Sequence, residues 1–254
     1  MQAQPSLDAA TGSFARTATW VGAVPALLVG VVLAVLVHPL VGLAAFVLVT
    51  VAWVVAVRSR LASAADRAVA GLDAAPMRPE EHPRLANVLD GLGATSGVTE
   101  PTVLLVRSDS VNAMVAASAE RVELVLTTGL VDQLGRLELE GVLANLLGRV
   151  KDGSAKYATT VLGVLGPTAR AHRLMSQHLG DQRAVMSDLA AVDLTRYPPG
   201  LMAALTAMAE RGTTLDVPAV TAPLWIAPVT PSGADAETGE RQPLSLRIAV
   251  LSEL

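Results

Sequence analysis

The chain has 254 residues, of which 52% are apolar, only 17% are charged and 3% are aromatic, with a formal net charge of −4 and no cysteine. This mild acidity offers no basic surface for nucleic acid, so no nucleic-acid partner is expected. The absence of cysteine excludes disulfides, thiolate zinc sites and cysteine nucleophiles. An average soluble domain has about 25% charged residues, so part of this chain departs from a soluble composition.

The missing charge is concentrated between Thr17 and Val57, where there is no Asp, Glu, Lys or Arg. This stretch is too long for one membrane span, and Pro39 divides it because proline cannot continue a helix. Residues 20–37 and 40–57 are each near the length of about 20 residues that crosses the hydrocarbon of a bilayer. The pattern predicts a two-helix transmembrane hairpin, and the alternative is a helical hairpin buried in a soluble protein.

The residues that flank this hairpin predict its orientation. Arg16 precedes the first helix, Arg58 and Arg60 follow the second, and the turn between them has no Lys or Arg. Because Lys and Arg are enriched in cytoplasmic segments, we expect a multi-pass protein of the plasma membrane with both termini and the main domain in the cytoplasm. Trp20 and Trp53 fall near one predicted membrane interface, which indole rings prefer.

Composition divides the chain into four parts. These are a cytoplasmic N-terminal tail (1–16), the transmembrane hairpin (17–57), a juxtamembrane helix (58–77) and a cytoplasmic domain (78–254).

Within the domain, β-branched runs at Thr102–Val106 and Val122–Thr127 predict two strands of a small sheet, joined by an irregular connection over Ser108–Glu120. Helical periodicity and proline starts predict helices over 79–97, 138–151, 155–165, 168–194 (as one helix or two), 199–211 and 244–254. A surface loop rich in Pro, Gly and acidic residues is predicted over 228–243. The expected fold class is therefore mainly α with a small β-sheet, an α+β arrangement behind a two-helix hairpin.

Several short motifs follow one another along the domain. They are Glu80–Leu85 (EEHPRL), Asn112–Met114 (NAM), Leu126–Leu130 (LTTGL), Glu138–Ala144 (ELEGVLA), Tyr197–Leu201 (YPPGL) and Pro243 with Arg247–Ile248. In these motifs the chain resembles the HtpX-type membrane zinc metallopeptidases, metallopeptidase family forty-eight, which also holds the CAAX prenyl proteases. The resemblance implies a zincin-like metallopeptidase fold, and a hairpin before a cytoplasmic domain agrees with the family's layout.

The family's chemistry depends on H-E-x-x-H, in which two His on one helix face bind zinc and the Glu activates the metal-bound water. In this chain the corresponding positions are Asn145, Leu146 and Arg149, and the family's third ligand, a Glu, corresponds to Ala184. An amide oxygen is a poor zinc ligand, while alkyl groups and a guanidinium offer no lone pair. We therefore expect zinc to be absent and no other cofactor to be bound.

Arg149 places a permanent positive charge near the vacated cation position. One hypothesis is that Arg149 substitutes electrostatically for the ion and pairs with Asp188 or Asp152, and the alternative is a solvated arginine on the helix surface. A relocated metal site that uses His172 or His178 is also open. A separation of six residues places those two His about 240° apart around a helix, so they do not share a face.

The framework motifs are present while the catalytic residues are replaced. The sequence therefore predicts a membrane-anchored, catalytically inactive metallopeptidase homologue, a pseudopeptidase. Its expected role is as a binding, scaffold or regulatory subunit of a membrane protein complex, whose partners are the lipid bilayer and a membrane protein such as an active homologue.

The resemblance also implies an edge strand that holds an extended substrate, with candidate peptide-binding residues Asn112, Ala113, Met114 and Thr127. Two alternative functions stay open. The first alternative is an active membrane zinc metalloendopeptidase with displaced ligands. The second is a small membrane subunit whose hairpin packs against other membrane spans.

Overall fold

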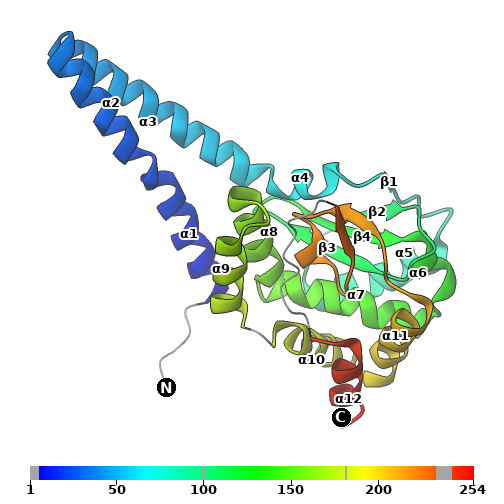
Figure 1. Cartoon of the computed structure of the whole chain (residues 1–254). Helices are drawn as coiled ribbons and strands as arrows, with labels where there is room; N and C mark the ends of the chain where they lie inside the picture. Colours follow the sequence, from blue (N-terminus) through cyan, green and yellow to red (C-terminus); the bar gives the residue numbers. More distant parts are fainter. Residues whose placement is uncertain (1–5, 99–100, 181, 233–241) are drawn as a thin grey trace.

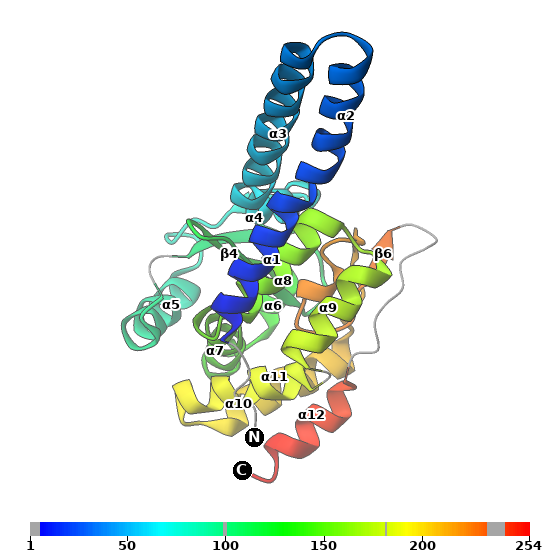
Figure 2. The ribbon, with the colours of Figure 1, turned by 90° about the vertical axis from the view of Figure 1, so that its left-hand side faces the viewer.

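The computed structural model describes residues 6–98, 101–180, 182–232 and 242–254 (Figure 1). A helical hairpin projects from a rounded domain, as two perpendicular views show (Figures 1 and 2). The hairpin consists of α1 (Leu7–Val21), α2 (Ala23–Leu36) and α3 (Pro39–Ala62). Residues 7–36 and α3 are each long and apolar enough to cross a membrane. The predicted pair of apolar helices is thus present, and its turn lies at Val37 and His38.

Small residues set the close approach of the hairpin helices. A Cβ atom added at Gly22 would lie 2.1 Å from the Trp53 ring, and one added at Gly42 would lie 2.4 Å from the Cβ of Ala34. The indole Nε1 of Trp53 donates a hydrogen bond to the Ala18 carbonyl at 3.2 Å. Side chains of this size at helix contacts allow tight backbone packing inside a membrane.

The predicted N-terminal tail is instead helical from Leu7 onward, with Ser6 as the N-cap. Ala10 is buried, and the first turns of α1 pack against α8 (Ser154–Leu165). Asp8 also lies 3.4 Å from Lys156 of that helix. The apolar side chains of α1 therefore find a partner surface that lies about 150 residues further along the chain, which local sequence does not reveal.

The juxtamembrane region is also more divided than predicted. Helix α3 continues to Ala62, a short helix α4 (Ala64–Ala70) follows, and residues 74–76 form strand β1. The four-stranded sheet has the order β1-β2-β4-β3, with β2 (Thr102–Val106) parallel to β4 (Val122–Thr127) and the other pairs antiparallel. The structure thus confirms the two predicted strands at their predicted ends.

Strand β3 (Ala113–Ala117) lies in the connection that was predicted to be irregular, so this prediction was wrong. All five of its residues are buried. A strand buried on both faces lacks the alternation of polar and apolar residues that identifies a half-exposed strand.

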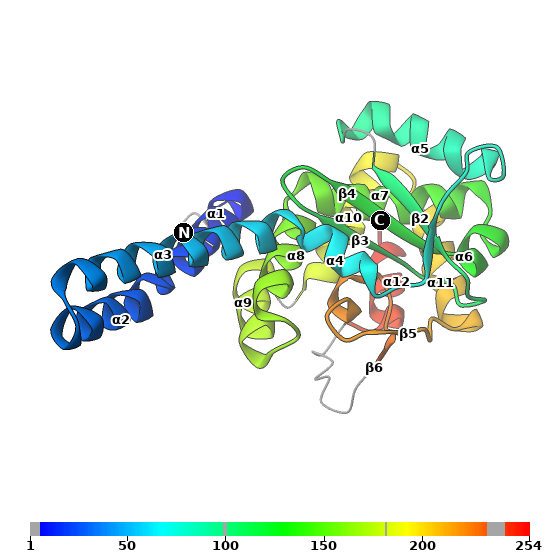
Figure 3. The ribbon, with the colours of Figure 1, turned by 90° about the horizontal axis from the view of Figure 1, so that it is seen from above.

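Helix α7 (Arg136–Lys151) packs against β3 and against α5, α8, α10 and α11. Seen from above, the hairpin points away from the domain that the other helices form with the sheet (Figure 3). The bounds of these other helices are α5 (Pro83–Ser96), α6 (Thr128–Gln133), α9 (Ala169–Leu179), α10 (Arg183–Thr195), α11 (Pro198–Arg211) and α12 (Leu244–Leu251). Two short strands, β5 (Asp216–Pro218) and β6 (Thr230–Ser232), pair in parallel, and a 3-10 turn covers Ala222–Leu224. The mainly helical fold with a small sheet is confirmed, while residues 233–241 of the predicted surface loop lie outside the described residues.

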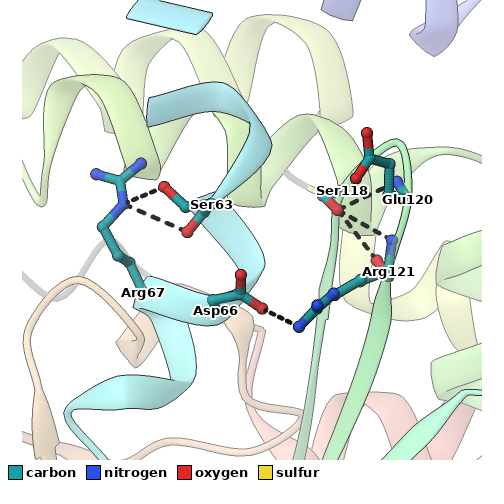
Figure 4. A network of polar contacts seen from close by, with 6 residues as sticks. All are labelled: Ser63, Asp66, Arg67, Ser118, Glu120 and Arg121. Carbon is teal, nitrogen blue, oxygen red and sulfur yellow. Dashed lines mark hydrogen bonds and ion pairs between the residues drawn. The ribbon is translucent and has the colours of Figure 1, made fainter. Parts of the chain in front are cut away.

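Polar contacts connect α4 to the turn between β3 and β4 (Figure 4). Arg121 Nη1 lies 3.0 Å from Asp66 Oδ1, and Arg67 Nε donates to the Ser63 hydroxyl at 3.2 Å. Ser118 Oγ accepts the N–H of Arg121 at 3.1 Å, which holds the turn that presents this arginine. The contacts therefore join the helix that leaves the hairpin to the edge of the sheet.

Glu123 of β4 makes this junction sensitive to pH. Burial raises the pKa of its carboxyl, and the negative charge of Asp66 raises it further. The folded state then holds the Glu123 proton more tightly than the unfolded chain, so stability falls as the pH rises through the folded-state pKa. We expect Glu123→Gln to flatten this part of the profile and to raise the melting temperature near neutral pH. Thermal unfolding in detergent between about pH 5 and pH 8 measures it.

Glu120→Gln is the matched control for this experiment, because Glu120 is exposed on the same turn. It should leave the pH profile as steep as that of the unaltered chain. A Glu123→Gln profile equally steep would contradict the assignment.

Candidate functional site

Helices α7 and α10 lie side by side and carry the four positions that the resemblance aligns with a metal site. Asn145 on α7 and Asp188 on α10 are each 1% exposed, and Asn145 Nδ2 donates to Asp188 Oδ1 at 2.9 Å. Leu146 is fully buried in the main apolar core. Arg149, one turn after Asn145, and Ala184, at the start of α10, line one small pocket. The structure therefore brings Asn145, Arg149 and Ala184 to the α7–α10 interface.

The carboxylate of Asp188 has Arg247 of α12 as its charge partner. Arg247 Nε donates to Asp188 Oδ2 at 2.7 Å, and Nη2 donates to Oδ1 at 2.7 Å. Arg247 Nη1 donates to the Ile226 carbonyl at 2.8 Å. Burial raises the pKa of Asp188, while the hydrogen bonds from Arg247 and then from Asn145 oppose this shift. Three helices are thus joined through one buried carboxylate.

Arg149 does not form the ion pairs that the sequence led us to consider. Its Nη1 donates to the Leu224 carbonyl at 2.8 Å, and no ion pair with Asp188 or Asp152 occurs among the described residues. Asp152 is exposed and accepts the N–H of Ser154 at 2.8 Å. Burial, followed by the positive charge of Arg183, lowers the pKa of Arg149 to about 10. Arg149 is half-buried and bound to main chain, so it is not a freely solvated surface arginine either.

A pocket of about 60 Å³ opens beside Arg149. The described residues that line it include three arginines, two serines, a glutamine and apolar side chains. They are Arg149, Ser154, Leu179, Arg183, Ala184, Ser187, Pro223, Trp225, Ile226, Gln242 and Arg247. Sequence reasoning missed Arg183 and Arg247 as members of this site, although Arg247 belongs to one of the motifs that carry the resemblance. No local pattern pointed to Arg247, because it lies 59 residues from Asp188 and the burial of Asp188 is seen only in the structure.

The candidate peptide-binding residues are Asn112, Ala113, Met114 and Thr127, and all four are fully buried. Thr127 Oγ1 accepts the N–H of Leu130 at 3.2 Å and so caps α6.

The edge of β3 next to these residues is covered by residues 225–227 of the same chain. Met114 forms an antiparallel bridge with Trp225, and Ile226 N–H donates to the Ala113 carbonyl at 2.8 Å. The Asn112 amide donates to the Ala227 carbonyl at 3.2 Å, and its oxygen accepts the Ala227 N–H at 3.2 Å. A peptide that paired with this part of β3 would first have to displace residues 225–227.

The two histidines considered for a relocated metal site lie in separate environments on α9. His178 Nδ1 is 3.0 Å from the Tyr157 hydroxyl, whereas His172 Nδ1 is 3.1 Å from the Thr168 carbonyl. Asp181, which lies near them in sequence, is outside the described residues. Within the described part of the chain, no three His, Cys, Asp or Glu residues are placed to hold a metal ion together.

No family model matches the chain. It is 29% identical over 195 residues to the protease HtpX homolog of Dictyoglomus turgidum, which covers 62% of this chain and 64% of that protein. It is 28% identical over 187 residues to the protease HtpX homolog of Dictyoglomus thermophilum, with 58% of this chain and 61% of that protein covered. Protease HtpX homolog 1 of Streptomyces coelicolor is 33% identical over 107 residues, 41% of this chain and 35% of that protein. The chain is thus similar in sequence to HtpX-type proteases. It spans less than two thirds of the length of these curated relatives.

The donor set at the aligned positions of this chain does not fit zinc. The Asn145 amide is bound to Asp188, and the Leu146 side chain is enclosed in the apolar core. Arg149 has no lone pair to donate, and Ala184 has no donor atom at all. A Zn²⁺ ion here would lack the three ligands of a catalytic site and would be repelled by Arg149.

Proposed function

We propose that this HtpX-type homologue is a membrane-anchored pseudopeptidase, which binds a protein partner as a scaffold or regulatory subunit and does not cut it. The observation that carries the proposal is the buried network of Asn145, Asp188 and Arg247, which joins α7, α10 and α12 beside Arg149. Hydrogen bonds satisfy its polar atoms within the chain. Such a network stabilises a framework and supplies neither a nucleophile nor a general base.

The physical argument against peptide hydrolysis is the lack of a Lewis acid and a base. A zinc peptidase needs three protein ligands for the metal and a carboxylate or imidazole that activates its water. At the aligned positions this chain has an amide, an alkyl group, a guanidinium and a methyl group. The fold around these positions is well packed without such donors, and binding of a partner is a role that requires no chemistry there.

The hairpin supports the membrane part of the proposal. Two helices are long and apolar enough to span a bilayer, and large apolar side chains such as Leu28, Val35 and Leu48 are more than 60% exposed. Arg16, Arg58 and Arg60 flank the apolar part, so we place both ends of the hairpin on the cytoplasmic side.

Metal stoichiometry of the detergent-purified full chain tests the proposal. We expect the native chain to contain no zinc. A variant with Asn145→His, Leu146→Glu, Arg149→His and Ala184→Glu restores two imidazoles and two carboxylates and should bind about one zinc per chain. A matched variant that keeps Ala184 should bind zinc more weakly, because it lacks the third protein ligand.

Zinc at about one per native chain, together with chelator-sensitive peptide hydrolysis, would overturn the proposal in favour of a metalloendopeptidase with displaced ligands. The zinc content of the native chain decides this outcome even where the variant with four substitutions does not fold. Circular dichroism of each variant shows whether the helical content is retained.

A further inference from the structure

Two of the three guanidinium groups at the 60 Å³ pocket have no carboxylate partner among the described residues. Arg247 is neutralised by Asp188 at 2.7 Å. Arg149 instead donates to a neutral carbonyl of Leu224, and Arg183 Nη1 lies 4.0 Å from the thioether sulfur of Met175, a weak acceptor. The described lining of the pocket therefore contains two arginines without an ion pair and no acidic residue, while the nearby carboxylates of Asp152 and Asp188 act on Arg149 only through their charge.

The positive charges of Arg149 and Arg183 repel each other, and both side chains are partly buried. The charge of Arg183 lowers the pKa of Arg149, and burial lowers the pKa of both groups. Buried or half-buried charges in proteins are normally paired, because removal of an ion from water is costly. An anion between the two arginines would offset both the repulsion and the loss of hydration.

The start of α10 adds a second source of positive potential. Its first turn consists of Arg183, Ala184 and Val185. The side chain of the N-cap residue Gln182 accepts no hydrogen bond from the N–H groups of this turn. The Val185 N–H is already used by Gln242 Oε1 at 3.0 Å. The N-terminal end of a helix carries a partial positive charge and favours an anion close by.

The size of the pocket selects a small ligand. The pocket measures about 60 Å³, several times the volume of about 10–15 Å³ that one buried water needs. The pocket therefore has room for a small oxyanion. Guanidinium groups present a planar fork of N–H donors that suits phosphate oxygens, and a hydroxyl at Ser187 lines the same pocket.

We propose that this pocket binds a small phosphate-type oxyanion between Arg149 and Arg183. The inference deepens the proposed function, on which it rests for the equivalence of this pocket to the family's metal site. A cation position would thus have become an anion position through the introduction of Arg149 beside Arg183. The oxyanion is free inorganic phosphate or the phosphoryl end of a small monoester, which share this chemistry.

Titration of the detergent-purified full chain with inorganic phosphate tests the inference, with chloride at equal ionic strength as the reference. Calorimetry should give a dissociation constant for phosphate at or below about 1 mM. Phosphate at about ten times this dissociation constant should raise the melting temperature by a few degrees. Arg149→Gln and Arg183→Gln should each weaken binding about tenfold or more. Arg173→Gln, an exposed arginine on α9, should leave it unchanged.

A third variant, Arg149→Lys, separates charge from geometry. It keeps the positive charge but loses the fork, so its affinity should lie between those of the native chain and Arg149→Gln. Glycerol phosphate distinguishes the two sources. Tighter binding of this monoester than of phosphate assigns a phosphoryl end, and binding of phosphate alone assigns the free ion.

No binding of phosphate or glycerol phosphate up to about 10 mM, or equal binding by native chain and both glutamine variants, would overturn the inference. Stronger binding of acetate than of phosphate would also overturn it. These results are independent of the metal analysis. A native chain that contains no zinc and does not bind phosphate would refute only the proposed anion site. Zinc in the native chain would refute the proposed pseudopeptidase function.

Discussion

Replacement of Asp188 by alanine is expected to lower the free energy of unfolding by about 3–5 kcal/mol. Its carboxylate accepts two hydrogen bonds from Arg247 and one from Asn145, and both members of the ion pair are no more than 3% exposed. Removal of the carboxylate leaves the Arg247 charge buried without a counter-charge, which is the costly half of a buried ion pair. Chemical unfolding of the detergent-purified chain, followed by circular dichroism, measures the loss.

Asp193 supplies the matched control on the same helix. It lies 3.9 Å from Arg196, and both side chains are 82% exposed. Solvent screens such pairs, so Asp193→Ala should change the free energy of unfolding by no more than about 0.5 kcal/mol. Equal effects of the two alanine substitutions would contradict the assigned role of Asp188.

A double replacement tests whether the cost comes from the stranded charge. Asp188→Leu combined with Arg247→Met removes both ions and replaces them with apolar groups of similar size. Buried pairs replaced in this way often lose little stability. We expect the double variant to be more stable than Asp188→Ala alone, and a loss equal to the sum of the single effects would contradict this reason.

Two glycine-to-alanine substitutions are expected to change stability in opposite directions. A Cβ atom at Gly141 of α7 would lie 2.6 Å from the main-chain nitrogen of Leu201 and 2.7 Å from its Cα, where α11 crosses. Main chain cannot rotate away, so the two helices must separate, and we expect Gly141→Ala to cost about 1–3 kcal/mol. A Cβ at Gly91 of α5 meets no atom within 4 Å. Gly91→Ala should therefore stabilise the chain by up to about 1 kcal/mol through helix propensity.

The same unfolding measurement checks both substitutions. Each is the control of the other, because both replace a helical glycine with alanine. A stabilising Gly141→Ala would show that α7 and α11 are not in main-chain contact at this crossing. The result bears on function because α7 also carries Asn145 and Arg149. A shift of α7 would move these side chains relative to α10.

Local sequence predicted the parts of the fold whose signals are local. Strands β2 and β4 were predicted at their observed ends, because runs such as TVLLV have a strong β-preference. Helix α7 followed from an apolar stripe that includes Leu139, Val142 and Leu143. Strand β3 was not predicted because a fully buried run of apolar residues has no alternation of polar and apolar side chains. The helical start of α1 was not predicted, because its packing partner, α8, is distant in sequence.

The candidate site divides in the same way. The identity of Asn145, Leu146, Arg149 and Ala184 already excluded a zinc donor set of the family's kind, because donor atoms belong to residues and need no fold. The neighbours of these residues needed the fold. Asp188 and Arg247 are 59 residues apart, and Asn112 and Ala227 are 115 apart. No local pattern specifies such a pairing.

By itself the sequence determined that a long uncharged segment forms two apolar helices and that Asn145, Leu146, Arg149 and Ala184 are not the residue types that bind zinc. Both follow from residue composition, since charge is excluded from hydrocarbon and an absent lone pair cannot bind a metal. Only the tertiary structure decided that Arg247, not Arg149, neutralises Asp188, and that residues 225–227 cover the edge of β3. The physical reason is that burial forces each polar group to find a partner, and the backbone course decides which partner is within 3 Å.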